Sequence, residues 1–289
     1  MTIALDQPDV DALSEVISEL GEWQHDRSPV QLHPGDIGWY WQFGGDATAA
    51  AVRTWRRKGR LLAVGFLDEP DLIRMGISPE ADHDQELAAQ LVSDFIRSER
   101  GVLPAGPVHV EARSGAALAH LLDGDGWEPD EPWTPLRRGF ESPVEDCSLR
   151  IEVITPGREG DLTAVHRSSF GSEQFTDERW RNLISGPAYD NARGIVGYDD
   201  RDNAVATATV WSAGEGRPGL IEPLGVHAEY RGHGYGRAIS LAAAAALQEM
   251  GASSAVVATP SANSGAVATY VSAGFTPGPE SRDRRWGGA

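Results

Sequence analysis

The sequence has a single cysteine, Cys147, among its 289 residues, which excludes an intramolecular disulfide and a cysteine-based metal cluster. No apolar run approaches the roughly 20 residues that cross a bilayer. The longest, LAAAAAL at 241–247, is far shorter. The opening stretch MTIALDQPDV shows no basic segment followed by an apolar one, so no secretion signal is evident. From these absences we expect a cytoplasmic protein with no membrane span and no metal.

Positive charge is scarce, and the acidity is unevenly distributed. The net charge is −18; residues 1–145 carry 12 basic against 26 acidic residues (−14), and residues 146–289 carry 13 against 17 (−4). Such a surface repels nucleic acid and anionic membranes and favours cationic partners such as amines. Acidity that serves only solubility is the alternative. A hydrophobic content of 40% supports a buried core.

Hydrophobic periodicity and turn residues predict helices and strands in both halves of the chain. In the first half we expect helices over 9–20, 48–58, 86–97 and 116–122, and strands over 39–43, 61–67, 72–77 and 108–112. After a polar connector over 141–148 we expect helices over 159–170, 178–183, 236–250 and 264–272, and strands over 149–154, 195–198, 204–211, 220–226 and 254–259, with a last strand from 274.

The two halves repeat one layout at nearly constant spacing. The strand ending at Ile77 matches the strand ending at Val226 at an offset of 149, and Trp127 matches Phe275 at an offset of 148. An internal duplication is the simplest explanation. We therefore predict two domains, residues 1–145 and residues 146–289.

Residues 231–237, RGHGYGR, lie between a predicted strand and a predicted helix. The chain lacks the Gly-Lys-Ser/Thr of a Walker loop, and a G-x-G-x-x-G count from Gly232 ends on Arg237, so the dinucleotide fingerprint fails. The remaining pattern suits a pyrophosphate, because glycines allow close backbone approach and a helix start presents free amides and a positive dipole. A glycine turn that only caps the helix is the alternative.

This stretch resembles the acetyl-CoA loop of the GNAT acetyltransferases, whose pattern is V-x-P-x-x-R-G-x-G-x-G after the fourth strand. Here it reads VHAEYRGHGYG over 226–236, with Ala228 in place of the common proline. The downstream residues of the family motif recur at the required spacing as Asn263, Ala266, Tyr270, Gly274 and Phe275. The resemblance covers roughly 149–280. It implies an α/β (α+β) fold of two tandem GNAT-like domains, each a mixed, mostly antiparallel sheet flanked by helices, an arrangement similar to that of the mycothiol synthases.

The resemblance implies acetyl-CoA as co-substrate and a fourth strand that separates from the fifth near Leu224–Val226. The Leu224 amide would polarise the thioester carbonyl as an oxyanion donor, and Tyr270 would protonate the departing thiolate. A structural Tyr270 packed beside Phe275 is the alternative. The cofactor-binding residues that the resemblance implies are Leu224, Val226, Arg231, Gly232, His233, Gly234, Tyr235, Gly236, Arg237 and Asn263.

Acyl transfer to an amine needs a base, because an ammonium group has no lone pair for attack. Glu222 is the best candidate, since it lies four residues before Val226, on the strand that borders the implied cleft. Pro223 is unusual in a central strand and fits a place where pairing is broken. A solvent-facing Glu222 with no catalytic role is the alternative, and a lone histidine such as His166 is more often structural.

The first half lacks the motif residues. The counterpart of 226–236 is ISPEADHDQEL at 77–87, in which Asp82 replaces Arg231 and no glycine remains. Gly115 and Leu122 stand at the positions of the motif Asn and Tyr. We predict a degenerate, non-catalytic GNAT-like domain that covers the second domain's cleft or holds the two domains together.

Together these features predict an N-acetyltransferase that moves an acetyl group from acetyl-CoA to a primary amine by direct attack. The acceptor would be a cationic small molecule or peptide, with no nucleic acid or membrane partner; a homodimer stays open. The alternative is a non-catalytic acetyl-CoA-binding sensor or scaffold module, which would not need both Tyr270 and Glu222. A Fem-type aminoacyl transferase is disfavoured, because the acidic surface repels tRNA.

Overall fold

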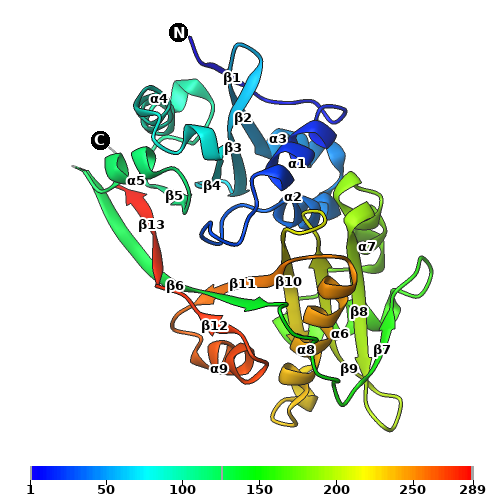
Figure 1. The fold of residues 1–289 in the computed structure, drawn as a ribbon. Coiled ribbons are helices and arrows are strands. Elements are labelled where there is room, and N and C mark those ends of the chain that lie inside the picture. Colours follow the sequence, from blue (N-terminus) through cyan, green and yellow to red (C-terminus); the bar gives the residue numbers. More distant parts are fainter. Residues whose placement is uncertain (1, 125, 288–289) are drawn as a thin grey trace. The chain divides into compact units, whose positions relative to one another are not determined.

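The computed structural model describes residues 2–124 and 126–287, which pack into two compact units (Figure 1). Unit 1 comprises the described residues of Met1–His33, Gly45–Trp133 and Glu280–Ala289, and unit 2 comprises Pro34–Gly44 and Thr134–Pro279. Each unit thus includes a segment that is distant in sequence from the rest of it. The predicted boundary between residues 145 and 146 stays a prediction.

Unit 1 is built on a sheet with the strand order β1-β2-β3-β4-β5-β13-β6. Its paired strands are antiparallel except β4 and β5, which run parallel with Ile73 opposite Val110. The strands are β1 (Ala4–Asp6), β2 (Val52–Arg57), β3 (Arg60–Glu69), β4 (Leu72–Ile77), β5 (Val108–Ala112), β13 (Ser281–Trp286) and the first part of β6 (Trp127–Gly139). The helices are α1 (Leu13–Glu22), α3 (Gly45–Ala51), α4 (Gln85–Ile96), α5 (Ala116–Leu122) and the short 3₁₀ turns η2 (Pro79–Ala81) and η3 (Ser98–Arg100).

Unit 2 has the strand order β6-β11-β10-β9-β8-β7, and β12 also pairs with β6. Here β10 and β11 form the parallel pair. The strands are the second part of β6, β7 (Arg150–Val153), β8 (Ala192–Tyr198), β9 (Ala204–Trp211), β10 (Pro218–Val226), β11 (Ser254–Pro260) and β12 (Thr276–Pro277). The helices are α2 (Pro34–Tyr40), α6 (Gly160–Phe170), α7 (Asp177–Ile184), α8 (Tyr235–Glu249), α9 (Ser264–Ser272) and the 3₁₀ turns η1 (Trp41–Phe43), η4 (Pro187–Asn191) and η5 (Ala228–Tyr230).

The two units share one order of elements. Unit 1 runs β2-β3-β4-α4-β5-α5-β6, and unit 2 runs β8-β9-β10-α8-β11-α9-β12, each with its parallel pair joined through a helix. In unit 2, α8 buries an almost continuous row of small and apolar residues, including Ile239, Ala243 and Leu247, in the core. The predicted fold class, mixed and mostly antiparallel sheets flanked by helices, is confirmed.

The last strand of unit 1 comes from the C-terminal segment. Strand β13 lies between β5 and β6 (Figure 1), with Arg284 opposite Val110 and Trp286 opposite Trp127. The rings of Trp127 and Trp286 lie 5.5 Å apart. Strand β13 thereby connects β5 to β6 in the sheet of unit 1.

Two predicted elements were wrong. The segment expected as a strand over 39–43 is helical, because α2 and η1 pack into unit 2 through contacts that local sequence does not encode. The helix expected over 48–58 ends at Ala51, after which β2 buries Val52 and Trp55. Lys58 and Gly59 then take φ values of 53° and 79° and form the tight turn into β3.

Within the described part of the chain, no helix has both the length and the apolar character needed to cross a bilayer.

Candidate active site

Strand β10 carries an irregularity at Glu222 and Pro223. Ile221 lies opposite Val210 and Leu224 lies opposite Ala208. Glu222 and Pro223 together therefore face a single residue of β9, as in a β-bulge. Pairing with β11 is confined to Pro218–Leu220, whereas residues 224–226 pair with β9. The fourth strand of unit 2 therefore separates from the fifth, as the resemblance implied.

The glycine loop connects β10 to α8 in a conformation that glycine favours. Gly232 and Gly234 have φ values of 81° and 82°, and an added Cβ at either residue would meet nothing within 4 Å. Gly234 is the N-cap of α8 and provides no side-chain cap for its amides. The start of a fifteen-residue helix is thus presented to open space, the geometry that suits an anion.

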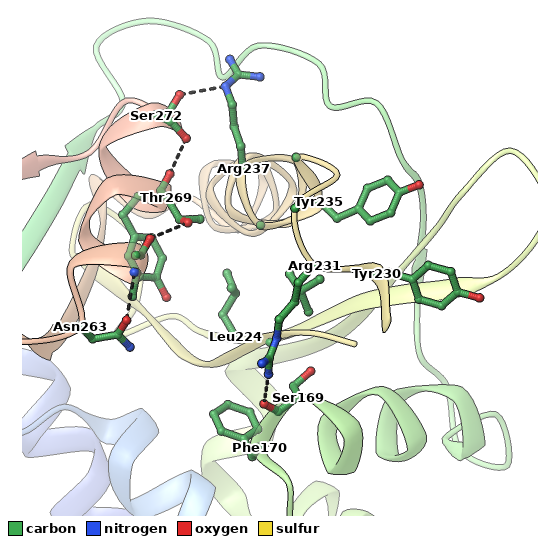
Figure 2. A pocket seen from close by; sticks show the side chains of 18 residues that line it. Ser169, Phe170, Leu224, Tyr230, Arg231, Tyr235, Arg237, Asn263, Thr269 and Ser272 are labelled. Atoms are coloured by element: carbon green, nitrogen blue, oxygen red, sulfur yellow. Dashed lines mark hydrogen bonds between the residues drawn. The ribbon is translucent and has the colours of Figure 1, made fainter. Parts of the chain in front are cut away.

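A cavity of about 700 Å³ lies at this point, between the loop, the end of β10, α9 and the end of α6 (Figure 2). All the sequence-predicted site residues line it except Glu222 and His233. Those that line it are Leu224, Val226, Arg231, Gly232, Gly234, Tyr235, Gly236, Arg237, Asn263 and Tyr270. The structure therefore brings together two motifs that are far apart in the sequence.

The cavity has a wall that the sequence did not reveal. Ser169 and Phe170, at the end of α6, line it opposite the loop. This end is held to the loop region by the Ser168 hydroxyl, which accepts from the Ala228 amide at 3.0 Å. A Cβ on Gly225 would lie 2.6 Å from the Ser169 Cβ, so strand and helix approach too closely for any larger residue. The other lining residues without an assigned site role are Gly225, Tyr230, Gly265, Ala266, Thr269 and Ser272.

Two of the predicted cofactor residues have side chains engaged elsewhere. Arg237 donates from Nε to the Ser272 carbonyl at 2.8 Å and lies 3.3 Å from Glu145 Oε1, pointing toward α9 (Figure 2). The His233 Nδ1 faces the Arg231 carbonyl at 2.9 Å, and its ring stacks on Tyr235. Their backbone amides remain part of the loop.

Tyr270 is 7% exposed and reaches the cavity wall from α9. Burial raises the pKa of its hydroxyl well above the ordinary value, and the charge of Glu222 raises that pKa further. The phenol is therefore protonated at neutral pH, with a carboxylate close enough to affect it. Its ring also packs edge-on against Phe275 at 5.5 Å, so the structural contact weighed from the sequence is present as well.

The remaining candidates occupy defined positions. Glu222 is half-buried at the bulge, and its backbone carbonyl accepts from the Trp211 indole at 2.7 Å. Asn263 caps α9 by accepting from the Ala266 amide at 3.1 Å. His166 is buried among aromatic rings, and this burial lowers its pKa to about 4.

The corresponding place in unit 1 is occupied by the chain's own carboxylates. Asp84 caps α4 through the Leu87 amide at 2.9 Å and pairs with Arg57, which lowers the pKa of that carboxyl group. Asp82 accepts from the amides of Gly115 and Ala116, both at 3.1 Å. The start of α4 thus has an internal anion, whereas its counterpart in unit 2, the start of α8, has no side-chain cap.

No group of three or more His, Cys, Asp or Glu side chains that could hold a metal is found among residues 2–124 and 126–287.

Comparisons with known proteins agree with this geometry. Residues 161–275 match the acetyltransferase (GNAT) family. Among solved structures, the fold is similar to that of a tandem GNAT protein from the clavulanic acid biosynthesis pathway (TM-score 0.62, 12% identity, 98% of each chain covered). It is also similar to a GNAT-family acetyltransferase from Colwellia psychrerythraea (0.62, 13%, 100% of each chain) and to a GNAT acetyltransferase from Sphaerobacter thermophilus (0.57, 18%, 98% of this chain and 95% of that one). Among curated proteins, none matches the sequence.

Residues 161–275 therefore match the GNAT family, as the sequence motifs predicted, and the chain as a whole has a fold similar to that of a tandem GNAT protein. The residues that match this family of acetyltransferases all lie in unit 2.

Proposed function

We propose that unit 2 transfers an acetyl group from acetyl-CoA to a primary amine on a small molecule or peptide. The observation that carries this proposal is the cavity itself, in which an open helix start, a separated strand and a buried tyrosine meet. The loop amides from Gly232 to Arg237 would hold the pyrophosphate, and the freed edge of residues 224–226 would bind the pantetheine arm.

The chemistry assigns one role to each of three groups. Glu222 accepts a proton from the ammonium form of the acceptor, directly or through water, and the nitrogen lone pair then attacks the thioester carbon. The Leu224 amide donates to the carbonyl oxygen as negative charge develops on it. The C–N bond forms, the C–S bond breaks, and Tyr270 gives its proton to the departing sulfur. The acylated nitrogen then loses its extra proton, directly or through water, to the Tyr270 oxygen, which restores the phenol.

Charge favours a cationic acceptor. Unit 2 and the chain as a whole carry an excess of acidic residues, and a negative surface raises the local concentration of amines. We expect neither nucleic acid nor an anionic membrane as a partner.

Calorimetry with acetyl-CoA, followed by thiol release over a panel of aliphatic, aromatic and peptide amines, tests the proposal. We expect binding and turnover with at least one amine, and loss of turnover in Glu222→Gln with binding retained. Binding without turnover on any amine would instead support the non-catalytic sensor or scaffold. Absence of binding would contradict both functions.

A further inference from the structure

Helix α2 lies directly on the ring of Trp211 within unit 2. A Cβ on Gly35 would lie 2.5 Å from the Trp211 Cγ, and a Cβ on Gly38 would lie 2.4 Å from its Cζ3. Real side chains do not approach so closely, so only glycine fits at either position. The stretch PGDIGWY at 34–40 is thus shaped to fit one indole ring.

Trp211 in turn holds the strand irregularity at the candidate base. It is 1% exposed at the end of β9, and its Nε1 donates to the Glu222 carbonyl at 2.7 Å. A bulge disrupts ladder hydrogen bonding, and a buried carbonyl without a hydrogen-bond donor is costly. The indole N–H supplies a partner for the carbonyl at this bulge.

Further contacts fix α2 and η1 to unit 2. The ring of Trp39 lies 4.8 Å from that of Phe175, and Arg179 lies over the ring of Phe43 at 4.9 Å. A Cβ on Gly186 would lie 2.5 Å from Trp41, which shows another close fit. The segment is therefore anchored on both sides of the place where it meets Trp211.

We propose that Trp211, held in place by Gly35 and Gly38, is a positioning residue for Glu222. This inference rests on the proposed function, since it acts through the proposed base. The indole fixes the Glu222 backbone at the bulge and so fixes where the carboxylate stands relative to Tyr270. Helix α2 prevents the ring from turning away, and a segment far from the other residues of unit 2 in sequence thereby becomes part of the catalytic geometry.

Two variants and one control test the positioning role of Trp211. Trp211→Phe keeps an aromatic ring at this position and removes the N–H donor, and Gly38→Ala forces the indole ring to move. For both we expect kcat with the best amine of the panel to fall about 10- to 100-fold, because small misplacements of reacting groups have effects of this size. The acidic limb of the pH–rate profile should shift, while acetyl-CoA affinity stays within about twofold. Gly160→Ala is the matched control, because its added methyl group meets nothing within 4 Å.

The activity of Glu222→Gln distinguishes a failure of the positioning role from a failure of the proposed function. If Glu222→Gln loses activity while Trp211→Phe and Gly38→Ala keep the wild-type kcat and pH profile, the positioning role is wrong and the proposed function stands. If Glu222→Gln is fully active, the proposed base is wrong, and the positioning role falls with it.

A spectroscopic readout needs no acceptor. The indole N–H resonance of Trp211, assigned by its loss in Trp211→Phe, should be protected from hydrogen exchange in the wild type and in Gly160→Ala, and should lose protection in Gly38→Ala. Free exchange of this proton in the wild-type protein would overturn the inference whatever the activity.

Discussion

The guanidinium of Arg231 donates from Nη2 to the carbonyl of Ser169 at 2.7 Å, joining the glycine loop to the end of α6 (Figure 2). This carbonyl belongs to the last turn of the helix, where a cation is stabilised by the dipole. Arg231, the first residue of the loop motif, is thus bound to the opposite wall of the cavity.

The Arg231 contact predicts a specific pattern of ligand affinities. In Arg231→Met we expect the wall to loosen and both CoA and pantetheine to bind about 3- to 10-fold more weakly, since a hydrogen bond of about 1 kcal/mol is lost. Titrations with the two ligands measure this. Because pantetheine lacks the pyrophosphate, a loss confined to CoA would show that Arg231 contacts phosphate instead.

The open helix start predicts strong sensitivity to an added carboxylate. Gly234→Asp would place a negative charge at the amides of α8, and we expect acetyl-CoA affinity to fall at least about 100-fold. Gly157→Asp is the control, because Gly157 has a similar φ of 85° and open space around it but does not line the cavity. Equal losses in the two variants would mean that general destabilisation, and not the loop, is responsible.

Removal of the Tyr270 hydroxyl separates its chemical role from its packing role. Tyr270→Phe keeps the edge-on contact with Phe275, so we expect the free energy of unfolding to change by about 1 kcal/mol or less. Turnover should fall about 100-fold if the phenol protonates the leaving sulfur. Tyr230→Phe, which changes a second cavity tyrosine, should keep its activity. A wild-type kcat in Tyr270→Phe would leave only the structural role.

His166 predicts a loss of stability in acid. Burial among the rings of Trp39, Phe170 and Phe175, and secondarily the Arg167 charge, lower the pKa of His166 from 6.5 to about 4. Between these values the unfolded chain binds more protons, so the free energy of unfolding falls as the pH drops from 7. At pH 4.5 this effect amounts to about 2.5 kcal/mol. Denaturant titrations of the wild type and His166→Leu should show a shallower pH dependence in the variant, and parallel curves would contradict the assignment.

Strand β13 predicts that the C-terminal segment stabilises unit 1. A variant that lacks residues 280–289 loses the strand between β5 and β6 and exposes Trp127. Hydrogen exchange in β5 and β6 should accelerate by orders of magnitude, because their shared partner is gone. Trp286→Phe, which keeps the strand, should show a much smaller effect. Unchanged protection in the truncated chain would mean that β5 and β6 are stable without β13.

The sequence predicted those elements whose local signals agree with their tertiary environment. The strands Leu72–Ile77, Val108–Ala112 and Ala204–Trp211 and the helices Ala116–Leu122 and Ser264–Ser272 have the predicted bounds. Much of the site was also predictable, because loop and α9 residues carry a motif with fixed spacing.

The rest depends on contacts between distant residues. Aromatic side chains at 39–43 favour a strand locally, but the fit of Gly35 and Gly38 on Trp211 selects a helix. Strand β13 reads SRDRRW, a polar stretch whose extended form comes from its two neighbours. Ser169 and Phe170 line the cavity only because α6 ends beside the loop, which the spacing of the motif does not report.

Residues 34–44 belong to unit 2 and residues 280–289 to unit 1, so each unit includes a segment that is synthesised far from the rest of it. Residues 34–44 leave the ribosome long before Trp211, the ring on which α2 lies, and β5 is synthesised long before β13, the strand that pairs with it. Each unit must therefore hold an incomplete core until the other part of the chain has emerged. A single cut anywhere between residues 34 and 279 would leave neither fragment with all the residues of either unit, so over this range the completeness of both units depends on one continuous chain.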